Sequence, residues 1–155
     1  MIPAIPYTTS NTHRILIVDD HPRVASSLQI GLERLPNCEV CVATGGEQAL
    51  RLFEQQPFDL LITDYQMPDT DGLTLATHIR QLYPQTIIFV FTAHDSPTMR
   101  EQASRIPIHR IIGKPTTLRE VRQAVLAALG IDEQQLLIQT DGPGHIISVR
   151  DRSLL

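Results

Sequence analysis

The chain has 155 residues, of which 42% are hydrophobic and 19% charged, a balance typical of one soluble globular domain. Its net charge of -4 argues against direct binding to nucleic acid, because phosphate backbones are held by basic patches. No apolar stretch approaches the roughly 20 residues that span a bilayer, so we expect no membrane insertion. Residues 1–13 lack the basic start and apolar core of a signal peptide, and we expect them to be a flexible leader of a cytoplasmic protein.

The first two strand–helix units are predicted by apolar runs and by helical spacing near the start of the chain. Ile15–Val18 predicts a strand, and Pro22 suits the first position of the helix that follows it. A second strand is predicted over 39–43, and a second helix after the Gly45-Gly46 turn. The side chains that we expect to face inward from these helices are Val24, Leu28, Leu32, Leu35, Ala49, Leu50 and Phe53.

The next two units repeat the same pattern. Strands are predicted over 59–63 and 86–91, each followed by a segment with helical spacing. The second of these segments, 96–104, is the most polar of the predicted helices. The side chains that we expect to face inward from the two helices are Leu75, Ile79, Leu82, Met99 and Ala103.

The fifth unit closes the regular pattern, which covers 14–130. A strand is predicted over 108–112, and the helix after it opens with a capping box, in which Thr117 and Glu120 satisfy free backbone donors. A glycine just past its end is a typical helix stop. Residues 131–155 are expected to form a C-terminal extension, either a β-hairpin around a Gly-rich turn or a truncated linker.

Two cysteines form a C-x-x-C pair, which is a pattern of redox and metal sites. Cys38 and Cys41 fall in or beside a predicted strand, where residues three apart face opposite sides of the sheet. We therefore expect two separate, reduced cysteines.

Polar residues follow four of the apolar runs. Asp19 and Asp20 follow the first run, Asp64 the third, Thr92 the fourth and Lys114 the fifth. If the strands are parallel, their carboxyl ends lie along one edge of the sheet, where open α/β sheets bind ligands. Three carboxylates, a hydroxyl and an ammonium group are then expected to meet there.

This set of side chains suits a divalent cation and a phosphoryl group. Neighbouring carboxylates repel one another unless a cation is present, and hard oxygen ligands are those that Mg²⁺ prefers. A carboxylate is also a nucleophile toward phosphorus once the charge on the transferring group is neutralised. The ammonium and the hydroxyl would each contact a phosphoryl oxygen. The pattern favours metal-dependent chemistry on an aspartate.

The chain resembles the receiver domain of the two-component response regulators, the CheY-like family. The resemblance covers roughly residues 13–130, and its ordered set of motifs is far more specific than any one of them. The matching motifs are Ile15–Pro22, Asp64–Pro68 with Asp71-Gly72, Thr92-Ala93 and Lys114-Pro115. The resemblance implies a flavodoxin-like fold, a doubly wound parallel sheet of five strands in the order 2-1-3-4-5.

The resemblance also implies the roles of the acidic residues. Asp64 would accept a phosphoryl group from a histidine kinase or a phosphotransfer protein. Asp19 and Asp20 would hold Mg²⁺ or Mn²⁺ together with Asp64 and the backbone carbonyl of Gln66. The chain would catalyse only its own phosphorylation and dephosphorylation, so it would be a signalling module and not an enzyme.

The remaining motifs imply a switch. Thr92 would move its hydroxyl toward the phosphoryl group, with the Ala93 backbone amide nearby, and Lys114 would bind a phosphoryl oxygen beside a cis bond to Pro115. The family usually has an aromatic switch residue three positions before this lysine, where this chain has Ile111. We expect phosphorylation to survive that change, since it lies outside the site, and the signal relay to differ.

Two other functions stay open. One is a pseudo-receiver that acts only as an interaction scaffold. The other is an Asp-nucleophile phosphatase of the haloacid-dehalogenase type, which places a second Asp two residues after the nucleophile, where this chain has Gln66. The downstream protein partner is not set by the sequence, and a homodimer through the fourth helix, fifth strand and fifth helix follows by family analogy alone.

Overall fold

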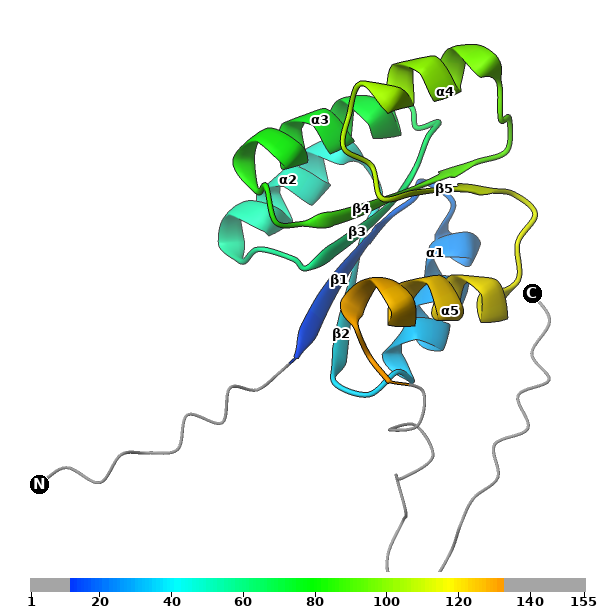
Figure 1. Ribbon diagram of the computed structural model, residues 1–155. Helices are drawn as coiled ribbons and strands as arrows, with labels where there is room; N and C mark the ends of the chain where they lie inside the picture. The colour runs from blue at the N-terminus through cyan, green and yellow to red at the C-terminus, as the bar shows by residue number, and fades with distance from the viewer. Residues whose placement is uncertain (1–11, 133–155) are drawn as a thin grey trace, which may run out of the picture.

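The structure is a computed structural model that describes residues 12–132. Strands and helices alternate along this part of the chain without exception (Figure 1). The predicted hairpin at 136–149 lies outside the described residues. The elements are β1 (His13–Val18), α1 (Pro22–Glu33), β2 (Cys38–Ala43), α2 (Gly46–Gln55), β3 (Leu60–Asp64), α3 (Gly72–Leu82), β4 (Ile87–Thr92), α4 (Pro97–Ser104), β5 (Arg110–Gly113) and α5 (Leu118–Leu129).

The strands form one parallel sheet in the order β2-β1-β3-β4-β5, which confirms the predicted fold. Helices α1 and α5 cover one face of the sheet, and α2, α3 and α4 cover the other (Figure 1). Each face has its own apolar core. Since every strand runs the same way, all five carboxyl ends lie along one edge of the sheet.

The continuous apolar runs exist because the central strands are buried on both faces. In β1, Ile15 and Ile17 enter the core under α1 and α5, whereas Leu16 and Val18 enter the core under α2, α3 and α4. None of the four is more than 1% exposed. Burying a side chain of this kind contributes about 1.5–3 kcal/mol, so this strand anchors both layers.

Two of the predicted inward residues are on the surface. Val24 is 38% exposed, because α1 turns Ala25 toward the core in its place. Leu82 is 64% exposed, because it is the last residue of α3 and lies one turn beyond Ile79, which is fully buried. The prediction for the polar helix α4 is confirmed, since Met99 and Ala103 are both buried.

The helix ends carry the expected local signals. In α5, the Thr117 hydroxyl accepts a hydrogen bond from the Glu120 N–H, and the Glu120 carboxylate accepts one from the Thr117 N–H. The predicted capping box is therefore confirmed. Gly130 ends the helix at a φ of 67°, a conformation that favours glycine.

The two cysteines lie on opposite faces of the sheet, as predicted. Cys38 packs against the core under α1 and α5, and Cys41 packs against the core under α2, α3 and α4. Both are free thiols. Burial, together with the nearby Asp59 carboxylate, raises the pKa of the Cys38 thiol, so this cysteine is held in its unreactive protonated form.

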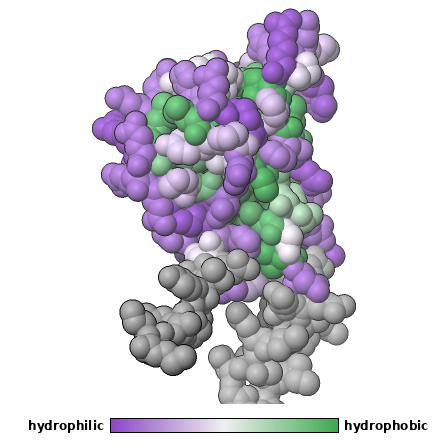
Figure 2. Space-filling view, turned by 60° about the vertical axis from the view of Figure 1, so that its left-hand side comes forward, coloured by the Kyte–Doolittle hydropathy of each residue, from purple (hydrophilic) through white to green (hydrophobic). Residues whose placement is uncertain are grey.

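The described part of the chain exposes few large hydrophobic side chains. On the face drawn in Figure 2, hydrophilic side chains surround smaller apolar patches. The large hydrophobic side chains that are exposed within the described residues are Val24, Ile30 and Leu82. None of the helices in 12–132 combines the length and the apolar character needed to cross a bilayer.

Candidate functional site

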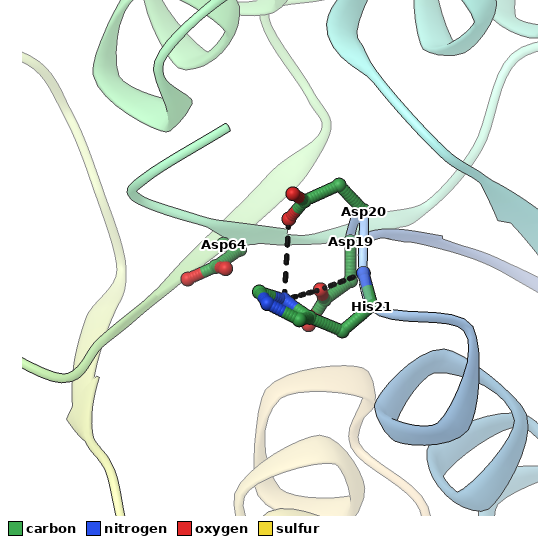
Figure 3. Close-up of side chains that lie close together, drawn as sticks. All are labelled: Asp19, Asp20, His21 and Asp64. Carbon is green, nitrogen blue, oxygen red and sulfur yellow. Dashed lines mark hydrogen bonds and ion pairs between the residues drawn. The ribbon is translucent and has the colours of Figure 1, made fainter. Parts of the chain in front are cut away.

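Three carboxylates meet at the carboxyl edge of the sheet. Asp19 and Asp20 follow β1, and Asp64 is the last residue of β3, the neighbouring strand. Asp19 and Asp64 are 3% and 7% exposed, whereas Asp20 is more open. One ligand atom from each of them, and one from His21, all lie within 4.8 Å of one another (Figure 3). The structure thus brings together the predicted acidic residues.

Lys114 brings a positive charge to the same cluster. It follows β5, and its backbone N–H donates to the Thr92 carbonyl at 2.7 Å, which fixes the start of the loop. Its Nζ lies 3.4 Å from Asp64 Oδ1 and 3.7 Å from Asp19 Oδ2. The Lys114-Pro115 bond is cis, as the resemblance implied. The ammonium group therefore faces two buried carboxylates at once.

The electrostatics of Asp64 show that one ammonium group does not balance the cluster. Burial raises the pKa of this carboxyl, the Lys114 ammonium lowers it, and the Asp19 carboxylate raises it again. The net effect is an increase in the pKa, so ionisation of Asp64 is less favourable here than in an isolated aspartate. An additional cation beside it would favour the ionised form.

The donor set fits a divalent cation. Asp20 Oδ1 is shielded from solvent and accepts no hydrogen bond from the described residues, because the His21 Nδ1 that lies 3.2 Å from it is not aligned for one. A shielded carboxylate oxygen in this state costs free energy unless a cation is near. A hollow of about 450 Å³ opens beside it. The residues lining that hollow are Asp20, His21, Tyr65, Gln66, Met67, Pro68 and Asp71. Carboxylate and backbone oxygens around a small hollow are what Mg²⁺ needs, since it retains several waters.

Thr92 ends β4 with its hydroxyl turned toward its own loop. The Thr92 hydroxyl donates to the His94 carbonyl at 3.0 Å and accepts from the His94 N–H at 3.1 Å. Its side chain is buried, whereas Ala93 is exposed. Thr92 therefore ends the strand next to β3, as predicted, but its hydroxyl makes its hydrogen bonds within the β4–α4 loop.

The loop between β3 and α3 is held at both ends. The Gly72 N–H donates to the Tyr65 carbonyl at 2.8 Å, which closes the loop on itself. Midway, the Asp69 carboxylate accepts from the N–H groups of Gly46 at 3.4 Å and Glu47 at 3.3 Å, at the start of α2. A negative charge at a helix N-terminus is favourable, so α2 positions the segment that contains Gln66.

Ile111 occupies the position of the usual aromatic residue and packs against the core. It lies on β5 opposite Val90 and packs, half-buried, against the core under α2, α3 and α4. A branched aliphatic side chain in this place has few rotamers and no ring to turn outward. This explains in physical terms why a different relay is expected.

His21 is the member of the cluster that the sequence reasoning missed. It follows two aspartates and precedes Pro22, the first residue of α1, so its place at the helix N-cap could be predicted from the sequence. The direction of its ring was not, because an N-cap side chain usually turns to the helix backbone. Here its Nδ1 lies 3.1 Å from Asp19 Oδ1 and 3.2 Å from Asp20 Oδ1.

The raised pKa of Asp64 predicts how replacing this residue with asparagine changes the stability of the fold. A carboxyl whose pKa is raised in the folded protein stabilises the fold below its unfolded value of 3.8 and loses that contribution as the pH rises. We therefore expect Asp64→Asn to melt at a higher temperature than the wild type at pH 7 and without metal. The gain should vanish as the pH falls below 4. Thermal unfolding followed by circular dichroism across this range is the measurement.

Asp69→Asn is a control in which the change in stability should have the opposite sign to that of Asp64→Asn. Burial is the largest single influence on the pKa of Asp69 and raises it, but the backbone N–H groups of Glu47, Thr70 and Gly46 together outweigh burial and hold the pKa of that carboxyl below its usual value. Asp69→Asn should therefore lower the melting temperature at pH 7 and have less effect as the pH falls. Equal shifts for both variants would contradict the electrostatic account.

The family model for the response regulator receiver domain matches residues 15–126. The chain is 35% identical over 116 residues to the response regulator protein PilR of Pseudomonas aeruginosa, covering 75% of this chain but only 26% of PilR. It is 28% identical over 120 residues to a probable chemotaxis protein CheY of Rhizobium etli, covering 76% of this chain and 92% of that protein.

A solved structure shares both the sequence and the fold. This is the signal receiver domain of an HD domain-containing protein from Pseudomonas fluorescens, with 31% identity and a TM-score of 0.72. The match covers 77% of this chain and 95% of the solved one. The family model matches residues 15–126, and the five strands have the order β2-β1-β3-β4-β5. The chain therefore belongs to the response regulator receiver domain family.

Proposed function

We propose that residues 14–130 form a receiver that accepts a phosphoryl group on Asp64 from the phosphohistidine of a histidine kinase or phosphotransfer protein. The observation that carries this proposal is the position of Asp64 at the end of β3, buried among two further carboxylates and 3.4 Å from Lys114 Nζ. Receiver domains act in signalling, and Mg²⁺ binding and phosphorylation are typical of them.

The proposed step is an in-line displacement at phosphorus. One oxygen of the Asp64 carboxylate attacks the phosphorus atom, the P–N bond to the donor imidazole breaks, and the imidazole leaves with the bonding electrons. A Mg²⁺ or Mn²⁺ ion held by Asp19, Asp20, Asp64 and the Gln66 carbonyl would neutralise charge on the transferring group. Lys114 stabilises a phosphoryl oxygen through the ammonium group that now contacts Asp64.

Thr92 and Ala93 would read the phosphorylated state. We propose that the Thr92 hydroxyl leaves His94 and donates to a phosphoryl oxygen, with the Ala93 backbone amide as a second donor. Ile111, on the next strand, would transmit that movement to the surface of α4 and β5 by packing alone. The downstream protein that reads this surface, and a homodimer through α4, β5 and α5, remain proposals by analogy, as does a cytoplasmic location.

The proposal is tested by chemical phosphorylation. The protein is incubated with Mg²⁺ and acetyl phosphate, in which acetate is the leaving group, and the intact mass is measured. We expect one added phosphoryl group, which Asp64→Asn abolishes. Asp95→Asn is the matched control, because Asp95 is an exposed carboxylate on the β4–α4 loop that pairs with Arg100.

The outcomes separate the three candidate functions. Absence of the added mass at saturating donor would contradict the receiver proposal and favour a scaffold that signals by contact alone. Rapid, repeated turnover of unrelated phosphomonoesters would favour the phosphatase. A label that persists in Asp64→Asn would place the acceptor elsewhere.

A further inference from the structure

The imidazole of His21 is turned into the acidic cluster and not away from it. In Figure 3 the ring lies between the carboxylates of Asp19 and Asp20, and Asp64 faces the same space. Its Nδ1 is 3.1 Å from Asp19 Oδ1 and 3.2 Å from Asp20 Oδ1. A nitrogen donor therefore belongs to the same set of atoms as the carboxylates.

The spacing of these atoms is that of ligands around one ion. Neighbouring ligands at about 2.1 Å from an octahedral ion are separated by about 3.0 Å, and opposite ones by about 4.2 Å. The two distances from Nδ1 to the aspartate oxygens match the separation of neighbouring ligands. The largest separation in the cluster, within 4.8 Å, exceeds the opposite-ligand value by an amount that a small side-chain movement removes.

The contacts that set the direction of the His21 ring are those with the two aspartates. His21 is the N-cap residue of α1, and its side chain makes no hydrogen bond to that helix. The side chain is 64% exposed, so core packing does not hold it. Its backbone N–H donates to Asp19 Oδ1 at 2.8 Å, and its ring Nδ1 shares a hydrogen bond with the same oxygen at 3.1 Å, so an ion placed between them would replace that hydrogen bond by two metal–ligand bonds.

We propose that His21 is a nitrogen ligand of the divalent-cation site and that it makes this site favour borderline transition-metal ions over Mg²⁺. The inference rests on the metal site of the proposed function and adds a ligand to it. A neutral imidazole with its proton on Nε2 presents a lone pair at Nδ1. Imidazole suits ions such as Co²⁺, Ni²⁺ and Zn²⁺, whereas Mg²⁺ prefers oxygen donors and water.

The test is a comparison of Co²⁺ and Mg²⁺ binding by the full chain. Co²⁺ affinity is followed by its visible absorption, and Mg²⁺ affinity by competition with Co²⁺. His21→Ser keeps a favourable N-cap residue but is too short to reach the ion. We expect it to weaken Co²⁺ binding by about tenfold or more, the scale of losses when even an indirect metal contact is removed. Mg²⁺ affinity should change far less.

A spectroscopic signature shows the bond itself. Proton NMR of the Co²⁺ form should contain a paramagnetically shifted, exchangeable imidazole N–H signal, which His21→Ser removes. His78→Ser is the matched control, since His78 is an exposed histidine on α3 outside the cluster, and it should retain the signal. Thermal unfolding of both variants verifies that each is folded.

Several results would overturn the inference. An equal loss of Co²⁺ and Mg²⁺ affinity in His21→Ser would make His21 a positioning residue for the carboxylates, and a signal that survives the substitution would assign the ligand to another histidine. Phosphorylation of Asp64 is measured separately with Mg²⁺ and acetyl phosphate. Its failure would leave the Co²⁺ signal unchanged, so the two proposals fail independently.

Discussion

Gly72→Ala is expected to destabilise the protein by about 3 kcal/mol, at the upper end of the cost of overpacking a well-packed interior. A Cβ at position 72 would lie 2.2 Å from the carbonyl oxygen of Asp64 and 3.1 Å from the Cα of Tyr65. Both atoms belong to the backbone, so no side-chain rotation relieves the contact. The start of α3 must move away from the end of β3, and urea unfolding monitored by circular dichroism should measure the loss.

The same substitution should impair phosphorylation in the molecules that do fold. The displaced backbone is that of Asp64, and the hydrogen bond from Gly72 to Tyr65 closes the loop that carries Gln66. We therefore expect the rate of labelling by acetyl phosphate to fall, together with a drop in melting temperature on the order of 10 °C.

Gly113→Ala provides the matched control for this prediction. Gly113 is at the end of β5, and no heavy atom lies within 4 Å of the place where its Cβ would be. Its φ is not positive, so alanine fits the backbone. This variant should retain the stability of the wild type. An equal loss in both variants would mean that glycine flexibility, and not the contact with Asp64, is responsible.

Lys114→Met should lower the rate of phosphorylation by about 100-fold, the usual effect of removing one preorganised group that stabilises transition-state charge. Methionine keeps most of the length of the side chain and removes the charge that lies 3.4 Å from Asp64 and 3.7 Å from Asp19. Quench-flow or mass measurements at fixed Mg²⁺ and acetyl phosphate give the rate.

The same variant should also lose stability, by about 2 kcal/mol at pH 7, because two buried carboxylates lose their common cation. This figure is below that of a fully buried pair, since the Lys114 side chain is 25% exposed. Without the ammonium group, the pKa of Asp64 rises further, and the cost of ionising it grows as the pH rises. The deficit should therefore be small near pH 4 and increase toward pH 7.

A double-mutant cycle isolates the electrostatic part of that loss. In an Asp64→Asn background, Lys114→Met should cost less than in the wild type, because one of the two carboxylates is already neutral. Lys114→Arg keeps the charge and should retain the stability. Additive losses in the cycle would show that Lys114 acts by packing of its stem and not by charge.

Much of the fold followed from the sequence because each central strand is buried on both faces. The runs that precede Asp19, Asp64 and Thr92 are almost wholly apolar and are separated by segments with helical spacing, and this alternation is typical of a parallel sheet covered on both sides. The helix faces were less certain. Val24 and Leu82 fit the spacing but lie where the helix surface leaves the core, which depends on how α1 and α3 sit on the sheet.

The site was predictable in its composition and less so in its geometry. Placement at strand ends brought Asp19, Asp20 and Asp64 together, since parallel topology alone decides this. The ring of His21 and the hydroxyl of Thr92 each turn about side-chain bonds that sequence patterns do not describe. Their directions depend on which neighbouring groups offer hydrogen bonds, and only the three-dimensional structure gives that.

The pairing of the Thr92 hydroxyl with His94 has a consequence for how finely the protein responds to its signal. The hydroxyl makes two hydrogen bonds to the backbone of one residue, and both are lost when the side chain rotates away. Since one neutral hydrogen bond contributes about 0.5–1.5 kcal/mol net, these two bonds favour the observed rotamer by a few kcal/mol at most. A hydrogen bond to a charged phosphoryl oxygen would be stronger than either of them, so such a contact would offset the loss and shift the population to the other rotamer.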